Sequence, residues 1–260
     1  DILIQNGASL SIEAGVEVFF QANSGISVSG SLRILGSAAQ PVQLTSADFY
    51  PWPGDWIGIK FLDLSDDASC LISNAVIGFA KTGVRCVDAS PAIVQSIIRD
   101  GSENGIYLER SSAVIRDNVI ENNSQDGIYA KDRSFPQVTG NRIWGNGSDG
   151  IELSGDTTRD RNSLPILSRN VIYENSQYGL RTVNYFEPRT TVISARSNWW
   201  GSAEAALIAQ TIYDNTDNPN NLPVVDYGNW WISSVGPALS GLFVQGQLAS
   251  NQVWRAADSP

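Results

Sequence analysis

The stretch Asn104–Ser148 reads NGIYLERSSAVIRDNVIENNSQ followed by DGIYAKDRSFPQVTGNRIWGNGS, which are two consecutive units of one repeat. Each unit contains three short runs in which apolar and polar residues alternate, and Gly, Asn, Ser or Asp separates the runs. Alternation with a period of two is typical of β-strands, and the separating residues are typical of turns. The stretch therefore predicts three short strands in each repeat.

The repeat extends in both directions at a nearly constant spacing. A glycine followed by an aliphatic residue recurs, with steps of 22, 22, 23 and 29 residues, at Gly83, Gly105, Gly127, Gly150 and Gly179. Such short strands are stable only when equivalent strands of successive units pair in parallel around a shared core. The spacing therefore predicts an all-β fold, a right-handed parallel β-helix (solenoid) of about eight to ten coils over residues 1–232. The longest step contains the polar segment Gly155–Asn162, which we expect to lie outside the stack as a loop.

The alternation also predicts which side chains point inward. The apolar rows expected to form the core are Ile106, Ile128, Ile151 and Leu180, and Ile98, Ile120, Ile143, Ile172 and Trp200. A structural asparagine ladder is expected two residues before the second row, at Asn74, Asn118, Asn141, Asn170 and Asn198. A further row follows at Asn123, Asn146 and Asn175, and two of its segments also fit the N-glycosylation pattern. We favour a turn or ladder role for these asparagines.

Composition excludes several classes of function. The chain has no His, which rules out a Ser-His-Asp triad and a zinc site with imidazole ligands. Its net charge of −10 argues against nucleic-acid binding through a basic surface. No run of 18 apolar residues is present, so we expect no membrane insertion. Cys86 is expected to point inward and Cys70 outward, so a disulfide between them is not favoured.

Three further segments resemble the secreted and cell-surface right-handed β-helix proteins of the pectin-lyase-like superfamily. Gly7–Phe20 (GASLSIEAGVEVFF) resembles the opening coil of that group, Gly54–Phe61 (GDWIGIKF) the coil after its first variable loop, and Ser197–Gly201 (SNWWG) its closing segment. With the central repeats, the resemblance covers about residues 2–232. It implies an extracellular or cell-surface location, while the group itself mixes enzymes, adhesins and scaffolds.

Residues 233–260 form a C-terminal tail in this interpretation. Gly246–Pro260 (GQLASNQVWRAADSP) resembles the lead-in that precedes an opening coil in such proteins, yet here it follows the closing segment. An open solenoid end exposes unpaired strand edges, to which a neighbouring chain adds easily. We therefore expect head-to-tail self-association, in a tandem array or filament, through the end residues Leu10, Ile12, Val18, Trp230, Trp231, Val253 and Trp254.

The outward rows offer an alternative role in carbohydrate binding. Beside the Gly-aliphatic motif, one row reads Arg85, Tyr107, Tyr129, Glu152, Arg181, and the next includes Glu109 and Lys131. We interpret these rows as a cross-strand charge ladder, with a sugar-binding strip as the alternative. The candidate glycan-binding aromatics are Tyr107, Tyr129, Trp144, Tyr173 and Trp199. The aromatic loop Phe49–Trp56 is expected to fold its rings onto the stack.

Enzymatic activity is the less favoured alternative. Glycoside-hydrolysing members of the superfamily resemble one another in clustered Asp residues and a Gly-His-Gly motif, which a chain without His cannot contain. Hydrolysis by two carboxylates remains open for Glu152 with Asp149, or for Glu109 with Asp132. Lyase members use an Arg or Lys base beside acidic calcium ligands, and we expect no such acidic cluster here. We expect no cofactor, with calcium as the alternative, because the Asp-rich loop Asp214–Asn221 offers oxygen ligands but lacks the Gly-spaced pattern of a calcium loop.

Two hypotheses therefore stand. The first is a non-catalytic extracellular structural or adhesive module that acts through its end-to-end contacts. The second is a β-helix that binds or degrades polysaccharide through its outward rows.

Overall fold

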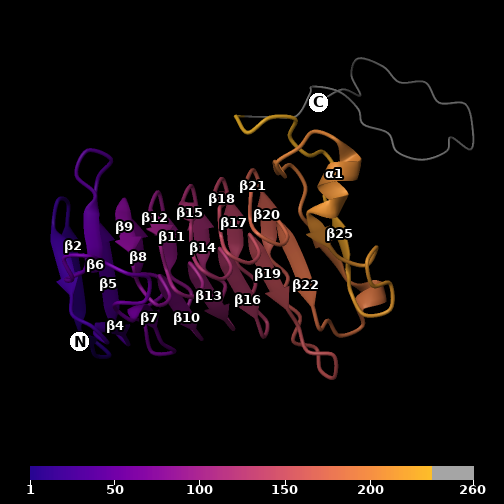
Figure 1. The fold of residues 1–260 in the computed structure, drawn as a ribbon. Helices are drawn as coiled ribbons and strands as arrows, with labels where there is room; N and C mark the ends of the chain where they lie inside the picture. Colours follow the sequence, from indigo (N-terminus) through magenta and orange to yellow (C-terminus); the bar gives the residue numbers. More distant parts are fainter. Residues whose placement is uncertain (236–260) are drawn as a thin grey trace, which may run out of the picture.

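A computed structural model describes residues 1–235, in which the chain winds as a parallel β-helix (Figure 1). Three long sheets run along the solenoid, because each strand pairs in parallel with the equivalent strand of the next coil. Successive coils contribute one strand to each sheet, and we name these sheets A, B and C in the order in which the chain first reaches them. The all-β solenoid predicted from the repeat is thus confirmed.

The strands of the three sheets are short and evenly distributed along the chain. Sheet A contains nine strands, namely β1 (Ile2–Ile4), β4 (Gly25–Val28), β7 (Gly58–Phe61), β10 (Val84–Val87), β13 (Ile106–Glu109), β16 (Ile128–Lys131), β19 (Ile151–Ser154), β22 (Leu180–Val183) and β24 (Ile212–Tyr213). Sheet B contains seven, namely β2 (Ser9–Glu13), β5 (Ser31–Leu35), β8 (Leu71–Ser73), β11 (Ala92–Val94), β14 (Val114–Arg116), β17 (Gln137–Thr139) and β20 (Ile166–Ser168). Sheet C contains seven, namely β3 (Glu17–Phe20), β6 (Val42–Ser46), β9 (Ala75–Gly78), β12 (Ile97–Arg99), β15 (Val119–Glu121), β18 (Arg142–Trp144) and β21 (Val171–Tyr173).

The inward side chains of the three sheets merge into one apolar core. Both predicted inward rows, from Ile106 to Leu180 and from Ile98 to Trp200, are buried. The glycine before each of the strands β10, β13, β16 and β19 is required by this packing. A Cβ on Gly127, for example, would lie 2.6 Å from Cγ2 of Ile143. The Gly-aliphatic motif therefore marks the place where sheet A approaches the isoleucines of sheet C.

Asparagines form two buried ladders along the axis. In the first, Asn118 Nδ2 donates to Asn141 Oδ1 at 3.0 Å, and Asn141 Nδ2 donates to Asn170 Oδ1 at 3.0 Å. Asn170 Nδ2 donates in turn to Asn198 Oδ1 at 3.0 Å. The second ladder links Asn123, Asn146 and Asn175 with amide hydrogen bonds of 3.0 and 2.9 Å. Each amide oxygen also accepts a backbone N–H, so the ladders satisfy the turns that they line.

Asn74 lies outside the first ladder, which corrects one of the expected positions. The step between these coils is 21 residues, because Ile97 pairs with Val76, and Ala75 therefore aligns with Ser96. Ser96 occupies the ladder position, where its Oγ accepts the N–H of Ala75 at 3.1 Å. Asn74 itself adopts a left-handed backbone with φ of 50° and its Nδ2 donates to Ser73 Oγ.

Two other expectations are wrong. Cys70 points inward and is buried, like Cys86, and both are free thiols. Only one ring of the aromatic loop folds onto the stack: Trp56 is buried and stacks on Phe20, with ring centroids 4.1 Å apart. The remaining aromatic residues of that loop are exposed, namely Phe49, Tyr50 and Trp52.

The C-terminal end of the described solenoid is closed by irregular structure (Figure 1). After β22 the chain forms η1 (Pro188–Thr190) and β23 (Val192–Ser194), then α1 (Ala205–Gln210), and, beyond β24, β25 (Val224–Asp226). β23 pairs with β25 in a two-stranded sheet of their own. Trp200, Ile208 and Val225 are buried here, so the last core residues are covered.

Candidate functional site

The outward face of sheet A carries the polar and aromatic rows expected from the sequence. Strand pairing places one row in register through Arg85, Tyr107, Tyr129, Glu152 and Arg181. In the neighbouring row Glu109 pairs with Lys131. Adjacent strands of a sheet lie about 4.8 Å apart, so the side chains within each row lie next to one another along the axis.

The two tyrosines at the centre of this face contact each other and a charged neighbour. Their ring centroids are 5.4 Å apart. The guanidinium carbon of Arg85 lies 3.7 Å from the centroid of the Tyr107 ring, and Tyr107 Oη donates to Glu109 Oε2 at 2.8 Å. Tyr107 therefore already uses one ring face in a cation–π contact within the protein.

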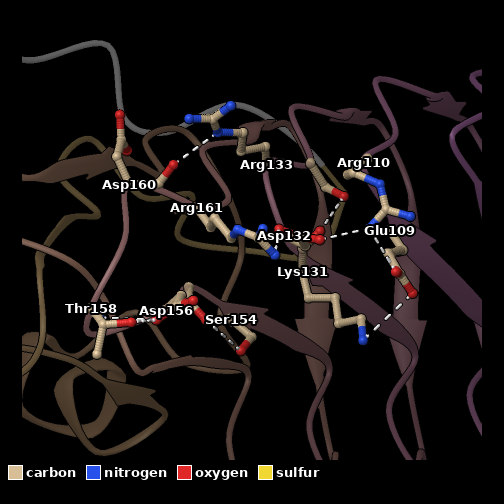
Figure 2. Close-up of polar contacts among 12 residues, drawn as sticks. Glu109, Arg110, Lys131, Asp132, Arg133, Ser154, Asp156, Thr158, Asp160 and Arg161 are labelled. Atoms are coloured by element: carbon tan, nitrogen blue, oxygen red, sulfur yellow. Dashed lines mark hydrogen bonds and ion pairs between the residues drawn. The ribbon is translucent and has the colours of Figure 1, made fainter.

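A ladder of ion pairs lies where sheet A turns towards sheet B, and Figure 2 shows its central part. Arg110 Nε lies 2.5 Å from Asp88 Oδ1, and Arg110 Nη1 lies 2.6 Å from Asp132 Oδ2. These three residues occupy equivalent positions of successive coils. Arg110 Nη1 also lies 2.7 Å from Glu109 Oε1. The ladder therefore joins three coils along the axis.

The inserted loop Gly155–Asn162 is attached to this ladder. Arg161 Nη1 lies 3.3 Å from Asp132 Oδ1 (Figure 2). Both residues line a cleft of about 440 Å³, together with Lys131 and Asp156. Because the cations of the cleft face carboxylates of the same cleft or ladder, we interpret this region as a structural clamp for the loop.

The carboxylate of Glu109 is poorly suited to donate a proton. Burial alone would raise the pKa of Glu109, but hydrogen bonds from Tyr107 and Arg110, with the charge of Lys131, bring that pKa below its ordinary value. Glu109 is therefore an anion at neutral pH. Glu109 and Asp132 are both held in ion pairs of the ladder.

A second carboxyl cluster lies at the opposite margin of sheet A. Carboxylate oxygens of Asp126, Asp149 and Glu152 lie within 4.8 Å of one another. Asp126 Oδ1 accepts the N–H of Asp149 at 3.0 Å, and Asp149 Oδ1 accepts the N–H of Tyr178 at 2.9 Å. The side chain of Asp149 is fully buried, whereas that of Glu152 is 17% exposed. Of Asp149 and Glu152, only Glu152 therefore faces the solvent on this sheet.

These acids hold protons unusually tightly. Burial, with repulsion from Asp126, raises the pKa of Asp149 to about 6 and that of Glu152 to about 7. Arg181 Nη1 lies 3.7 Å from Asp149 Oδ2 and 3.6 Å from Glu152 Oε2, beyond hydrogen-bond distance. Asp149 Oδ2 makes no hydrogen bond to any residue that the structure describes. The cluster can therefore store and release a proton near neutral pH.

The sequence expectation of no acidic cluster beside an arginine is corrected by this arrangement. The signal lies in the Asp-Gly pairs that open two successive repeats, Asp126-Gly127 and Asp149-Gly150, since equivalent turn residues stack along the axis. Calcium binds carboxylate oxygens at about 2.3–2.6 Å. Oxygens within 4.8 Å of one another could therefore share one such ion, and Asp126, Asp149 and Glu152 would be its ligands.

The second aromatic row lies at the C-terminal end of sheet C. The rings of Trp144 and Tyr173 are stacked, with centroids 5.8 Å apart and planes inclined by 4°. Trp199 forms a bridge with Val171 one coil further on. Tyr173 and Trp199 line a cleft of about 660 Å³, together with Leu207 of α1. The structure thus separates the five candidate glycan-binding aromatics into two sites.

The expected end-contact residues also fall into separate places. Leu10, Ile12 and Val18 lie on the inward side of the first coil, where Ile12 is buried and the other two are half-buried. Trp230 packs against the core at the opposite end, and its Nε1 donates to Ala203 O at 3.1 Å. Trp231 is half-buried beside it. Two further expected contacts, Val253 and Trp254, lie outside the described residues.

The acidic loop near the C-terminal end uses its first carboxylate internally. Asp214 Oδ1 accepts the N–H of Thr216 at 2.8 Å, and Asp214 Oδ2 accepts the N–H of Val225 at 2.9 Å. This carboxylate therefore closes the turn and anchors β25. Across residues 1–235, no helix is long and apolar enough to cross a membrane.

The comparison with known protein families agrees with this geometry. Residues 58–216 match the family described as right-handed beta helix region. No curated protein and no solved structure matches the chain. The matched segment runs from β7 to β24, which includes the ladders, both carboxyl clusters and the aromatic row. Because the match covers more than half of the chain, this protein belongs to the family of right-handed β-helix regions.

Proposed function

We propose that this chain is a non-catalytic structural or adhesive module of the cell exterior, which associates with neighbouring copies through its first coil. The observation that carries the proposal is an uncovered core. Leu10 and Val18 are only half-buried, whereas their register partners one coil further on, Leu32 and Leu44, are fully buried. One more coil placed on this end would bury them.

The backbone supports the same surface. β1, β2 and β3 are the terminal strands of sheets A, B and C, so each has one edge without a partner strand among the described residues. Unpaired edges bind further strands through main-chain hydrogen bonds. The first coil therefore combines three strand edges with apolar side chains, which is the chemistry that a second β-helical segment would complement.

We assign the partner segment to the tail of a neighbouring copy, Gly246–Pro260, on its resemblance to a lead-in strand. Burial of apolar surface contributes roughly 25 cal/mol per Å² and would drive the contact. The acidic net charge of −10 opposes close packing of copies at low salt. Association is therefore expected to strengthen as the salt concentration rises.

Sedimentation velocity of the full chain tests this proposal. We expect species larger than the monomer, whose fraction falls in Leu10→Lys because a charge then meets the partner strand. Phe135→Lys is the matched control, since Phe135 is an exposed apolar residue between β16 and β17, away from the first coil. Deletion of residues 246–260 should act like Leu10→Lys. A monomer at all concentrations, or equal association in both Lys variants, contradicts the proposal.

A second function, polysaccharide cleavage, is favoured by one observation. Glu152 is partly exposed on sheet A, has a pKa raised to about 7 and has the buried Asp149 behind it. A carboxyl group that keeps its proton near neutral pH can protonate a glycosidic oxygen. Release of reducing ends that falls as the pH rises above about 7, and is lost in Glu152→Gln, would support cleavage. Equal release by Glu152→Gln would contradict it.

A further inference from the structure

The aromatic row of sheet C stops at Tyr173, because the next position of the row is a glycine and carries no side chain. Trp144 stacks on one face of Tyr173, and the next position of the row is Gly201. A Cβ on residue 201 would lie 3.2 Å from Cβ of Tyr173, so a side chain there would stand on the tyrosine. Gly201 has φ of +82°, which favours glycine at this position. The Tyr173 ring therefore meets the cleft on the side away from Trp144.

The cleft around Gly201 is large enough for a sugar ring. Its volume is about 660 Å³, and residues of both α1 and sheet C line it. Leu207 of α1 is 46% exposed and lines the cleft, although helix side chains of its type are usually buried. Trp199 contributes a second aromatic surface. Trp200 and Ile172 also line the cleft, so its walls combine three aromatic residues with two aliphatic side chains.

Hydrogen-bonding groups surround these apolar walls. The cleft is lined by side chains that both donate and accept hydrogen bonds, among them Gln177, Gln210, Ser202 and Thr211. Its two charged side chains are of opposite sign, Arg142 and Glu174, and the guanidinium of Arg142 already hydrogen-bonds the hydroxyl of Tyr173. The cleft therefore has no excess of positive charge that would attract an anionic polymer, and the chain as a whole carries a net charge of −10.

We propose that this cleft binds a neutral pyranose ring of a polysaccharide or oligosaccharide. The flat C–H face of the sugar continues the Trp144–Tyr173 stack above Gly201, and its hydroxyl groups exchange hydrogen bonds with the glutamines and Ser202. Concave sites that pair apolar walls with a few polar groups are typical of small-ligand binding. The site lies at the closed end of the solenoid, and so it is independent of the association proposed for the first coil.

Titration calorimetry of the full chain with cellotetraose, mannotetraose and chitotetraose tests this site. We expect saturable binding of at least one of them. Tyr173→Ala should weaken that binding about tenfold, because the stacking surface is removed. Gly201→Asn is the sharper variant, since asparagine tolerates a left-handed backbone and its side chain fills the position beside Tyr173 while every aromatic ring remains. It should abolish binding and leave the sedimentation of the chain unchanged.

The double variant Tyr107→Ala/Tyr129→Ala is the matched control, because it removes two aromatic residues from sheet A. It should bind the same oligosaccharide as the unaltered chain does. Unfolding midpoints close to that of the unaltered chain show that the variants are folded. No saturable binding of any probe, full binding by Gly201→Asn, or loss of binding in the double variant alone would each overturn the proposal.

Discussion

The two ends of the solenoid contain the same kind of coil but differ in what covers it. At the N-terminal end, Leu10 and Val18 face the end of the core and are half-buried. At the C-terminal end, Trp200 and Ile208 cover the core and are themselves buried. The difference shows that an inward position in a β-helix is not buried by its own coil. Burial depends on the next coil or on a cap.

The same contrast extends into the polar part of the core. The first asparagine ladder runs from Asn118 to Asn198, towards the closed end, and Ser96 is its last member on the other side. Coils nearer the N-terminus hold their turns with other contacts, such as the hydrogen bond from Gly25 N to Asp1 Oδ1. The coils from Ser96 to the C-terminal end therefore share a polar ladder. The ladder stops at the next coil towards the N-terminus, where Ala75 aligns with Ser96.

The largest expected effect on stability comes from removing the tryptophan that covers the core at the C-terminal end. In Trp200→Ala the large, buried indole that covers Gly179 and Ile172 is lost. We expect the free energy of unfolding to fall by about 3–5 kcal/mol, the usual range for a buried tryptophan. Urea denaturation followed by circular dichroism measures this. A loss below about 1 kcal/mol would mean that the cap does not close the core.

A matched pair of leucines sharpens the contrast at the open end. Leu10 and Leu32 are register partners in sheet B, but only Leu32 is fully buried. We expect Leu32→Ala to cost about 3 kcal/mol and Leu10→Ala about 1 kcal/mol, because the cost of truncation follows the area removed from water. Denaturation of dilute protein, at which association is minimal, compares the two. Equal costs would mean that the first coil is covered.

Substitutions in the first asparagine ladder should have a smaller effect on stability, and Asn74, which lies outside the ladder, provides the control. Asn141→Ala removes the acceptor for both Asn118 N and Asn118 Nδ2. Leaving buried donors unsatisfied costs about 2 kcal/mol. Asn74→Gly should cost less than about 0.5 kcal/mol, since Asn74 lies outside the ladder, glycine tolerates its left-handed backbone, and its Nδ2 donates to the neighbouring Ser73 Oγ. Similar costs for the two variants would refute the distinction between the two positions.

The smallest expected effect on stability comes from the buried carboxyl group of Asp149. The pKa of Asp149, ordinarily 3.8, is raised to about 6, so the folded chain keeps protons that the unfolded chain has already released. The contribution of Asp149 to stability should therefore fall as the pH rises from about 4 to 6. Asp149→Asn, which keeps the Oδ1 acceptor for Tyr178, should reduce this slope and stabilise the chain at pH 8 by about 1 kcal/mol. Destabilisation at pH 8 would contradict the pKa shift.

The fold could be predicted from the sequence because its signal is repeated many times. Each Gly-aliphatic pair fixes one strand of sheet A, and a Cβ at Gly105, Gly127 or Gly150 would come within 2.8 Å of an isoleucine methyl group. Where a step changes length, the repeat alone misassigns the register. Asn74 shows this, because a coil of 21 residues shifts it by one position.

The sites were harder to predict because they are formed between coils. Asp126 and Asp149 are ordinary turn residues in their own repeats, and only stacking along the axis brings them to Glu152. Similarly, Tyr107 looks like a free stacking platform until Arg85 is placed over its ring. Such contacts depend on side-chain conformations that alternation of apolar and polar residues does not determine.

Hydrogen exchange at several protein concentrations tests the contrast between the ends most directly. If the first coil is an association surface, the backbone amides of β1, β2 and β3 should gain protection as the concentration rises. The amides of β23 and β25 at the closed end should keep the same protection throughout, and Leu10→Lys should remove the gain at the first coil. Protection of β1–β3 that does not change with concentration, or a gain confined to the closed end, would contradict this account of the molecule.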